Sequence, residues 1–412
     1  MARGPRWPLN PMPPLGLYLH VPFCSSICHY CNFNRGLFDG ALKDRYLGAL
    51  AREIRTVAER VNLGVHPVAG RPLEGRLRGV PARADTVYFG GGTPSLLSGP
   101  EISRLVAACR AGFDVADDAE VTLEANPETV TREAVDAWRE AGVNRVSLGV
   151  QSFRDEELRR LGRVHDAARA RNALETTRAA GIDNVSLDLM LWLPQQSVED
   201  CLSSVRTLAA LGPAHASLYL LEVYPNSPLK EDMARAGWSL APDDDAADMY
   251  LRTIEILAAA GYEHYEISNF ARPGRRARHN LKYWTDGEWL AFGCGAHSTL
   301  DGVRWKNAAA IVSYADAWDA GGRGAVAEIR PLTDAERFEE AMFMGLRLVD
   351  GVDLVDVRRR YGVDVWRRFG EHLMPFVEAG LLAREGRRLR LTPGGLLLSN
   401  DVMTVFIETR VR

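Results

Sequence analysis

The sequence predicts an α/β protein, a partial (βα)6 barrel followed by a small, mainly helical C-terminal domain. Segments rich in β-branched and apolar residues alternate with helical hydrophobic patterns as far as Ala260. This alternation requires parallel strands with right-handed crossovers, because each helix must bury its apolar stripe on the sheet. The alternation stops near Pro331, which predicts that a separate domain closes the chain.

The six predicted strands are short apolar segments, each followed by a helical pattern. Parallel α/β sheets bind ligands at the carboxyl ends of their strands, so motifs directly after these segments carry the most weight. The strands are expected at Gly16–Val21, Asp85–Phe89, Glu120–Ala125, Asn144–Val150, Asn184–Leu191 and Ala216–Val223.

The first predicted helix has the clearest pattern. Within Ala41–Val61, Leu42, Tyr46, Leu50 and Ile54 recur close to the 3.6-residue helical period and form one apolar stripe. The other helices of the barrel are expected at Gly99–Ala111, Thr131–Ala141, Ala167–Ala180, Ser197–Leu211 and Asp243–Ala260.

The remaining segments suggest how the chain is divided. Asn62–Ala84 holds four glycines and three prolines, which is typical of a flexible insertion. Thr333 is expected to cap a helix over Thr333–Val349, with Glu336 three residues later. We expect a barrel in residues 1–230, an accessory segment in residues 231–330 and a winged-helix-like helical domain in residues 331–412.

The composition is that of an ordinary globular protein. Of the 412 residues, 46% are hydrophobic and 25% charged, and the net charge of −4 offers no global attraction for nucleic acid or anionic lipid. No apolar run reaches the roughly 18 residues that span a bilayer. The first sixteen residues hold five prolines and no apolar core, which argues against a secretory signal peptide. We therefore expect a cytoplasmic protein with reduced thiols.

Cys24, Cys28 and Cys31 form a Cys-x3-Cys-x2-Cys motif directly after the first predicted strand. Soft thiolates select zinc or iron–sulfur clusters, and a structural zinc site needs four ligands. A [4Fe–4S] cluster on three cysteines leaves one iron free for a small molecule. The alternative is a zinc site with His29 as the fourth ligand. Cys109 and Cys201 lie in helical patterns and are expected to be core residues.

A glycine-rich turn follows the second predicted strand. Gly90, Gly91 and Gly92 precede Thr93, and three glycines in a row let a ligand approach bare backbone. A plain strand-to-helix turn is the alternative interpretation.

Polar side chains also end the later strands. Glu124 can accept a hydrogen bond from an ammonium group, Gln151 and Asp188 can bond ribose hydroxyls, and Arg163 can pair with a carboxylate. Singly, each is an ordinary polar residue at a sheet edge. Jointly they fit one zwitterionic, ribose-bearing ligand.

The cysteine spacing together with these motifs resembles the radical S-adenosylmethionine (SAM) superfamily over almost the whole chain. It is most similar to the branch of the oxygen-independent coproporphyrinogen III oxidases and the HemW-type haem chaperones. The resemblance implies a [4Fe–4S] cluster on the three cysteines and SAM bound at the open iron. It also implies that the methionine amino group contacts the glycine turn and that two tyrosines flank the cofactor. The residues concerned are Gly91, Gly92, Thr93, Tyr18 and Tyr30.

One segment departs from the family pattern. Relatives carry a glycine-containing turn after the fifth strand, whereas this chain has Trp192 directly after Leu191. The indole either narrows the pocket or packs under the following helix.

Two features separate the branches of the family. The oxidases continue the cluster motif with a further cysteine, and Phe33 occupies that position here. His279, Tyr283 and Trp284 belong to an HNxxYW motif that, in the chaperones, is implicated in holding haem. Imidazole is a natural axial ligand and aromatic rings stack on porphyrins. For His279, the alternative is a hydrogen-bonded loop histidine. Cys294 is either a haem thiolate ligand or a small buried residue.

The resemblance therefore implies a haem chaperone that delivers haem to haem-dependent apoproteins such as membrane-bound cytochromes. It implies that the chain is cytoplasmic or peripheral to the membrane, and that cluster and SAM order a homodimer. The enzyme alternative is a porphyrinogen oxidase or another radical dehydrogenase, and whether SAM is cleaved is open. A third alternative is RNA binding through Arg358–Arg360, Arg367–Arg368 and Arg387–Arg390, but the charge balance gives no reason to expect a nucleic-acid partner.

Overall fold

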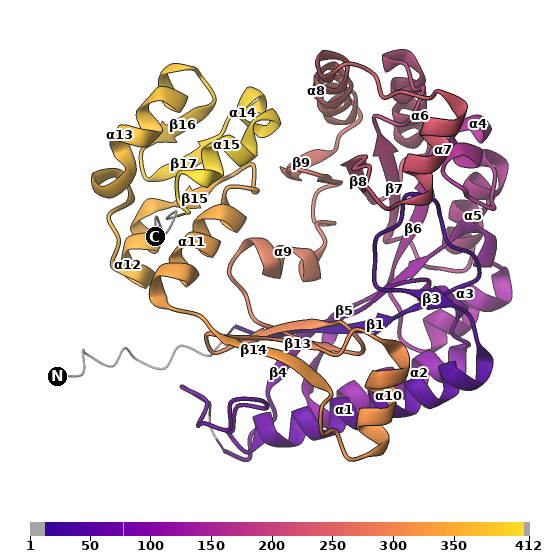
Figure 1. Cartoon of the computed structure of the whole chain (residues 1–412), viewed down its shortest axis with the longest axis vertical. Coiled ribbons are helices and arrows are strands. Elements are labelled where there is room, and N and C mark those ends of the chain that lie inside the picture. The colour runs from indigo at the N-terminus through magenta and orange to yellow at the C-terminus, as the bar shows by residue number, and fades with distance from the viewer. Residues whose placement is uncertain (1–12, 77, 408–412) are drawn as a thin grey trace.

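One curved twelve-stranded sheet organises most of the chain. The computed structural model describes residues 13–76 and 78–407, so most of the proline-rich start lies outside the described residues. Figure 1 shows the sheet as a curved wall with helices along its outer side and the C-terminal domain facing its inner side.

Six parallel strands form the centre of the sheet, in the order in which they occur along the chain. Each overlaps one predicted strand, and neighbouring strands pair in parallel, as between β5 and β6. An open sheet of this topology confirms the predicted partial barrel. The strands are β1 (Leu15–Val21), β4 (Arg83–Gly91), β5 (Asp114–Ala125), β6 (Arg145–Gln151), β7 (Val185–Leu191) and β8 (His215–Leu220).

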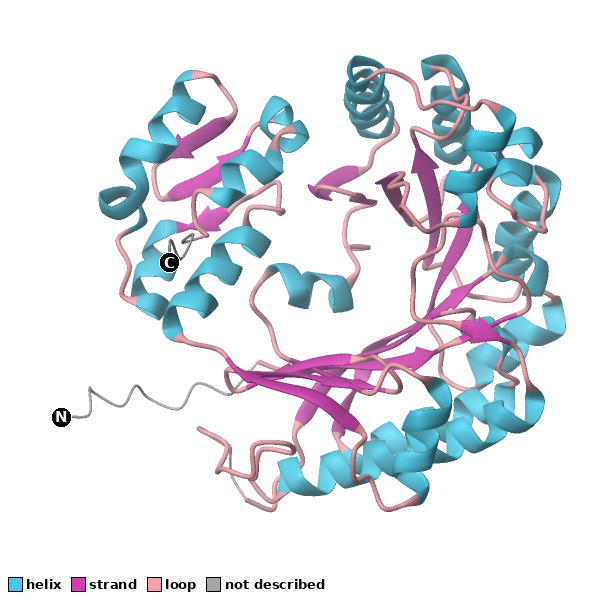
Figure 2. Cartoon of the chain, viewed as in Figure 1, coloured by secondary structure: helices cyan, strands magenta, loops and turns pink. Residues whose placement is uncertain are grey.

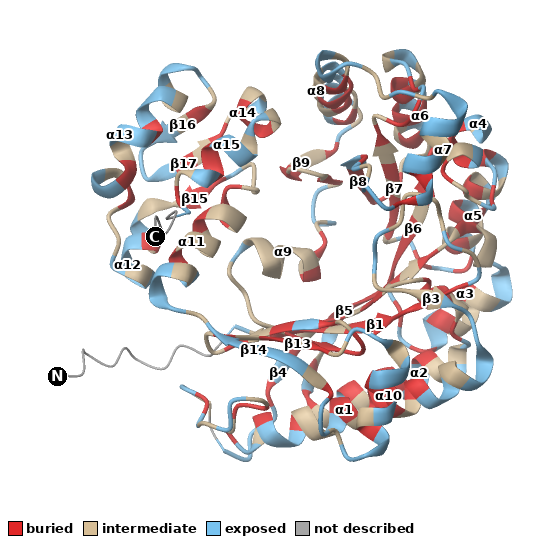
Figure 3. Cartoon of the chain, in the orientation of Figure 1, coloured by how far each residue is buried: buried red, intermediate tan, exposed pale blue. Residues whose placement is uncertain are grey.

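The crossover helices bury their apolar stripes against the sheet. In α1 (Gly40–Asn62) the buried residues include Tyr46, Leu50 and Ile54, and burial in Figure 3 concentrates on the strands and on the helix faces turned toward them. Cys109 and Cys201 are buried core residues, as predicted. The other helices and turns of this half are η1 (Pro94–Leu96), α2 (Gly99–Gly112), η2 (Pro127–Thr129), α3 (Arg132–Glu140), α4 (Asp155–Arg160), α5 (Ala167–Ala179), α6 (Val198–Leu211), α7 (Pro228–Ala236) and α8 (Asp243–Ala259).

Short strands that the sequence pattern did not predict extend the sheet at both edges. At one edge β11 pairs in parallel with β1, and β12, β13 and β14 follow it in the sheet. At the other edge β10 pairs with β8, and β9 pairs with β10. These strands have three to six residues each, too few for a clear alternation of polar and apolar side chains. They are β9 (Glu263–Glu266), β10 (Asn269–Ala271), β11 (Trp289–Phe292), β12 (His297–Leu300), β13 (Val303–Asn307) and β14 (Val326–Pro331).

Two helices accompany these strands. α9 (Arg278–Trp284) lies on the inner side of the curved sheet, where the backbone N–H of His279 donates to the Glu120 carboxylate of β5 at 3.1 Å (Figure 1). α10 (Ile311–Asp319) packs on the outside against α1. The boundary predicted at residue 230 falls within α7, and the division of this half into two parts stays a prediction.

The C-terminal domain begins just after β14, and its hydrophobic core also includes Tyr250 of α8. Thr333 and Glu336 form the capping box expected at the start of α11. Figure 2 shows helices around a small three-stranded sheet, with strand order β15-β17-β16. Its elements are α11 (Asp334–Gly345), β15 (Val352–Asp353), α12 (Leu354–Tyr361), α13 (Val365–Glu378), β16 (Leu382–Glu385), β17 (Arg388–Leu391), α14 (Pro393–Leu397) and α15 (Ser399–Thr404).

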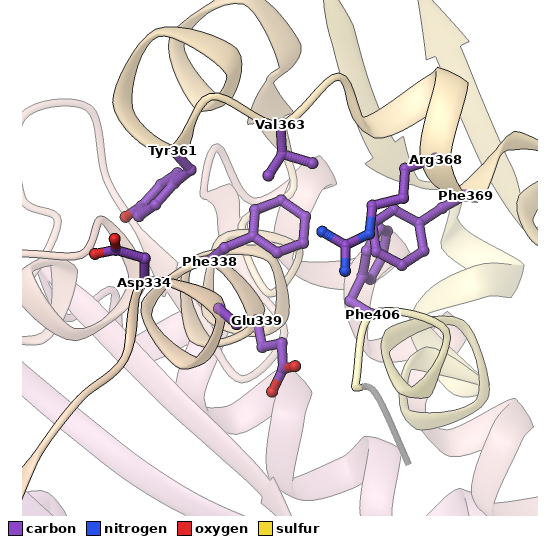
Figure 4. A pocket seen from close by; sticks show the side chains of 9 residues that line it. Asp334, Phe338, Glu339, Tyr361, Val363, Arg368, Phe369 and Phe406 are labelled. Carbon is purple, nitrogen blue, oxygen red and sulfur yellow. The ribbon is translucent and has the colours of Figure 1, made fainter. Parts of the chain in front are cut away.

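A small aromatic cavity of about 200 Å³ lies in this domain. The ring of Phe338 stacks on Phe369 at 5.7 Å, and Phe406 meets Phe369 edge-on at 5.3 Å (Figure 4). Its lining combines these rings with Asp334, Glu339 and Arg368, and it lies apart from the three clustered cysteines. Across the described residues, no helix combines the length and the apolar character needed to cross a bilayer.

Candidate functional site

The three clustered cysteines lie on the loop after β1. Cys24 ends β2 (Phe23–Cys24), which pairs with β3 (Gly36–Leu37), so the loop between these strands is closed at its base. The N–H of Phe38 donates to the Cys24 carbonyl at 2.9 Å, and the Cys31 N–H donates to the Cys28 carbonyl at 3.2 Å. All three are free thiols and line one cavity of about 680 Å³ at the carboxyl ends of the parallel strands.

The donor set fits an iron–sulfur cluster better than a single zinc ion. The Nδ1 atom of His29, the fourth ligand in the zinc alternative, lies 2.7 Å from the Asp232 carboxylate. Among the described residues, no three His, Cys, Asp or Glu side chains gather closely enough to hold one metal ion. Thiolates spread around a cavity match a cluster, because each ligates a different iron atom.

The glycine turn at the end of β4 packs directly on the cysteine loop. The N–H of Gly92 donates to the Val21 carbonyl at 2.8 Å, and the Thr93 N–H donates to the Phe23 carbonyl at 2.8 Å. A Cβ on Gly92 would lie 2.8 Å from the Phe23 oxygen. Gly91 has φ of +119°, a conformation that favours glycine. The turn therefore needs glycine both for its backbone and for the close approach to the loop.

Glu124 lies at the end of β5 and faces the same cavity. Its carboxylate accepts hydrogen bonds from the Tyr88 hydroxyl at 2.7 Å and from the Gly91 N–H at 3.1 Å. Burial raises the pKa of Glu124 to about 7. A ligand ammonium beside this carboxyl would favour its ionised form.

Arg163 connects the cysteine loop to β6. Its guanidinium donates to the Cys28 sulfur at 3.2 Å and to the Asn126 side-chain oxygen and the Gly149 carbonyl, both at 2.8 Å. Gln151, at the end of β6, has φ of +70° and lines the cavity close to this guanidinium. A fixed cation at this point can pair with a ligand carboxylate.

Asp188 faces the cavity from β7. It accepts hydrogen bonds from the Ser147 hydroxyl at 2.9 Å and from the Ser186 hydroxyl at 3.0 Å. Burial raises the pKa of Asp188. The two serine hydroxyls hold the carboxylate in the middle of the sheet. There it can accept hydrogen bonds from the hydroxyls of a ribose.

The sequence pattern did not single out Arg145, which is 1% exposed at the start of β6 and lines the cavity. Its Nε atom has no hydrogen-bond partner among the described residues. An arginine at the head of an otherwise apolar strand was the available signal, since a buried cation needs an anionic or polar partner. Other lining residues that were not predicted include Tyr88, Asn126, Ser147, Ser217 and Tyr219.

Trp192 lies at the cavity, which agrees with the first of the two roles that the sequence left open. Its indole lines the cavity, and its Nε1–H donates to the Ala241 carbonyl at 2.8 Å. Its φ of +64° is one that L side chains rarely adopt and that glycine adopts freely.

A second cavity of about 380 Å³ adjoins the first and shares Phe33, Gly91 and Glu124 with it. Tyr30 lines the larger cavity, whereas Tyr18 lines the smaller one. The two predicted tyrosines therefore lie at different cavities on either side of the shared residues.

The structure does not bring His279 to either cavity. Its side chain is buried, with Nδ1 2.8 Å from the Thr86 hydroxyl and Nε2 2.9 Å from the Tyr283 hydroxyl. Burial lowers the pKa of His279 to about 3. Tyr283 lines the second cavity, while Trp284 lines neither and packs under the Arg347 guanidinium at 4.4 Å. His279 thus makes hydrogen bonds on both ring nitrogens, from a helix and not from a loop, and its role toward haem stays a prediction.

Two other candidates have structural partners. Cys294 is buried, and the Asn34 side chain donates to its carbonyl at 3.0 Å and approaches its sulfur at 3.5 Å. Several arginines of the basic C-terminal segments pair with acids of the same domain or of the turn after α9. These pairs are Arg358–Asp364, Arg359–Asp356, Arg360–Asp286, Arg387–Asp353 and Arg390–Glu385.

Comparison with known proteins identifies relatives over the whole chain. The Radical SAM superfamily model matches residues 18–208 and the HemN C-terminal domain model matches residues 332–398. The haem chaperone HemW of Bacillus subtilis is 34% identical over 95% of this chain and 98% of its own length. The haem chaperone HemW of Mycobacterium tuberculosis is 38% identical over 97% of both chains.

Among solved structures, the coproporphyrinogen III oxidase HemN from Escherichia coli, described as a radical SAM enzyme, matches with a TM-score of 0.81 and 25% identity. The match covers 97% of this chain and 91% of the oxidase.

Proposed function

Because the chain belongs to the HemW family of haem chaperones within the radical SAM superfamily, we propose that it is a haem chaperone. It binds a [4Fe–4S] cluster, SAM and haem, and passes haem to apoproteins that require it. The observation that supports this most is the cavity at the carboxyl ends of the parallel strands, which unites the three cysteines with the polar strand-end residues.

The chain's own residues have distinct roles in this proposal. Cys24, Cys28 and Cys31 hold three irons of the cluster, which supplies one-electron chemistry when bound. The methionine part of SAM is held by its amino and carboxylate groups, and its ribose is held deeper along the sheet. The residues are Gly91, Gly92, Thr93, Glu124 and Arg163 for the methionine, Gln151 and Asp188 for the ribose, and Tyr18 and Tyr30 beside the cofactor.

Phe33 favours the chaperone over the oxidase. The family's oxidases have a cysteine at this position, and here the side chain is a phenylalanine that is 64% exposed at the rim of both cavities. An apolar ring at the mouth suits a macrocycle that docks and leaves. The fold match to the coproporphyrinogen III oxidase keeps that enzyme as the second candidate.

Anaerobic reconstitution of the full chain separates the two functions. The reconstituted protein is titrated with haem, followed by the Soret band, and in parallel is incubated with coproporphyrinogen III, SAM and a reductant. A chaperone forms a saturable haem complex and releases no decarboxylated product. Catalytic turnover of the porphyrinogen would instead establish the oxidase, and a Cys28→Ser variant controls for cluster-independent product.

The finer parts of the proposal concern partners and location. We propose that membrane-bound cytochromes are among the recipients, that the chaperone works at the membrane periphery, and that cofactor binding orders a homodimer. Haem transfer to an apocytochrome in vesicles, with the mass of the chaperone measured by light scattering before and after reconstitution, tests all three.

A further inference from the structure

Arg35 lies on the cysteine loop, outside the residues assigned to the cluster, SAM or haem. It comes four residues after Cys31 and directly before β3, the strand that closes the base of this loop. Its guanidinium donates to the Cys31 carbonyl at 2.5 Å, and its side chain lines the cavity of about 680 Å³ together with the three cysteines. The loop therefore carries its own cation next to the thiols.

Part of this guanidinium has no partner. The Nε atom of Arg35 is buried, and no hydrogen bond reaches it within the residues that the structure describes. Burial raises the pKa of the Cys24 and Cys31 thiols, and the positive charge of Arg35 acts against that rise at both. The charge is therefore felt at two of the three sulfurs. Hydrogen bonds to the sulfurs and the net charge around them are two of the factors that set the reduction potential of an iron–sulfur cluster.

The acids around the cavity are engaged elsewhere. Arg35 forms no ion pair in the part of the chain that the structure describes. Asp39, the next acid along the chain, caps α1. Three carboxylates line the same cavity, and each accepts hydrogen bonds from other donors: two serine hydroxyls, a tyrosine with a backbone N–H, and a second tyrosine. In that order they are Asp188, Glu124 and Glu222. The charge of Arg35 is therefore available to the group that the cysteines hold.

Arg163 is the other arginine that contacts this loop. Its guanidinium lies 3.2 Å from the Cys28 sulfur, but it is anchored on Asn126 and the Gly149 carbonyl and is assigned to the carboxylate of SAM. A bound carboxylate would offset the charge of Arg163. The charge of Arg35 has no such assigned partner, so it continues to act on the cluster when SAM is bound.

One-electron reduction of a [4Fe–4S] core held by three thiolates adds a negative charge to a group that is already anionic. A neighbouring cation stabilises the reduced form more than the oxidised form, because the Coulomb attraction grows with the charge. We propose that Arg35 raises the reduction potential of the cluster, so that a low-potential one-electron donor, which loses the electron that the cluster gains, reduces it more completely. This inference rests on the cluster of the proposed function and assigns the residue that tunes it. Arg35 acts through its charge and its unpartnered N–H and is not a ligand.

A redox titration of the anaerobically reconstituted full chain tests the role of Arg35. Dithionite is the electron donor, and electron paramagnetic resonance measures the reduced cluster. At the midpoint potential of the wild type, Arg35→Gln should lower the ratio of reduced to oxidised cluster at least about fivefold. Arg35→Lys keeps the charge and should stay closer to the wild type. Arg110→Gln removes an exposed arginine from α2 and should leave the ratio unchanged.

Iron and sulfide per chain are measured in each variant, because loss of the cluster would also remove the signal. A cluster that is lost from Arg35→Gln but kept by Arg35→Lys would still show that the charge acts on the cluster. An unchanged or higher ratio in Arg35→Gln with full iron content, or loss of the cluster from both variants, would overturn the inference. Haem binding by the wild type would then still support the proposed function, whereas a wild-type chain that assembles no cluster would remove both.

Discussion

The Nη1 atom of Arg163 lies 3.2 Å from the Sγ atom of Cys28, so the side chain after β6 directly contacts the cysteine loop after β1. The same guanidinium is anchored on Asn126 and the Gly149 carbonyl. This contact fixes the distance between the proposed cluster and the proposed carboxylate site.

Arg163→Ala should therefore weaken SAM binding by roughly ten- to a hundredfold, since a hydrogen bond to a charged group contributes about 1.5–3 kcal/mol. Cluster content, measured as iron and sulfide per chain, should change little. Arg159, exposed on α4, provides the control substitution. Equal loss of iron and SAM would contradict the separate roles assigned here.

Serine in place of Cys24, Cys28 or Cys31 should abolish the brown chromophore of the anaerobically reconstituted protein, because each thiolate is proposed to hold a separate iron. Iron content and electron paramagnetic resonance after reduction measure the loss. Cys109→Ala, in the core of α2, should keep the cluster. A colourless wild-type protein with stoichiometric zinc would contradict the cluster.

SAM affinity should increase as the pH rises through about 7, the raised pKa of Glu124. Below that pH the carboxyl is protonated and does not attract the ammonium of the ligand, and above it the carboxylate does. Equilibrium dialysis across this range measures the effect. Glu124→Gln should bind weakly and without this pH dependence, whereas affinity that falls with rising pH would exclude the assigned role.

Gly92→Ala should impair both cluster uptake and SAM binding. The added methyl would lie 2.8 Å from the Phe23 oxygen, and this contact involves backbone on both sides. Overpacking of this kind typically costs about 1–3 kcal/mol. Gly40→Ala is the matched control, because nothing lies within 4 Å of a Cβ there. Normal cofactor binding by Gly92→Ala would show that the turn can move.

Glu53→Ala should lower the free energy of unfolding by about 3 kcal/mol or more. The buried carboxylate accepts from the Asn307 amide at 2.6 Å, the Gly293 N–H at 2.8 Å and the Tyr314 hydroxyl, and all three donors would lose their partner. Chemical denaturation measures the change. Glu59→Ala, exposed on the same helix, should cost little, and a similar small loss for Glu53 would contradict this network.

Much of the fold and of the candidate site was accessible from local patterns. The period of Tyr46, Leu50 and Ile54 predicts α1, because one buried stripe leaves a trace in a single segment. The cysteine spacing and the glycine turn are equally local. The cysteines and the glycine turn line one cavity because parallel strands end at the same edge of the sheet.

Other features left no such trace. Strands β9 to β14 are short, and they pair because β1 and β8 offer open edges, which no single segment reveals. Arg145 faces the cavity because of its register in β6 relative to β5 and β7. The motif that contains His279 is visible in the sequence. Its hydrogen bonds to Thr86 and Tyr283 are not, because they depend on how α9 packs on the sheet.

By itself, the sequence determined the order of the strand–helix units and the chemistry of the three thiols, because hydrophobic period and ligand type are properties of short segments. The tertiary structure alone decided which histidine is buried and hydrogen-bonded and which one lines a cavity. His279 and His297 are the same side chain chemically, and they differ in the neighbours that distant strands bring to them: two hydrogen-bond partners for the first, and an open aromatic cavity for the second.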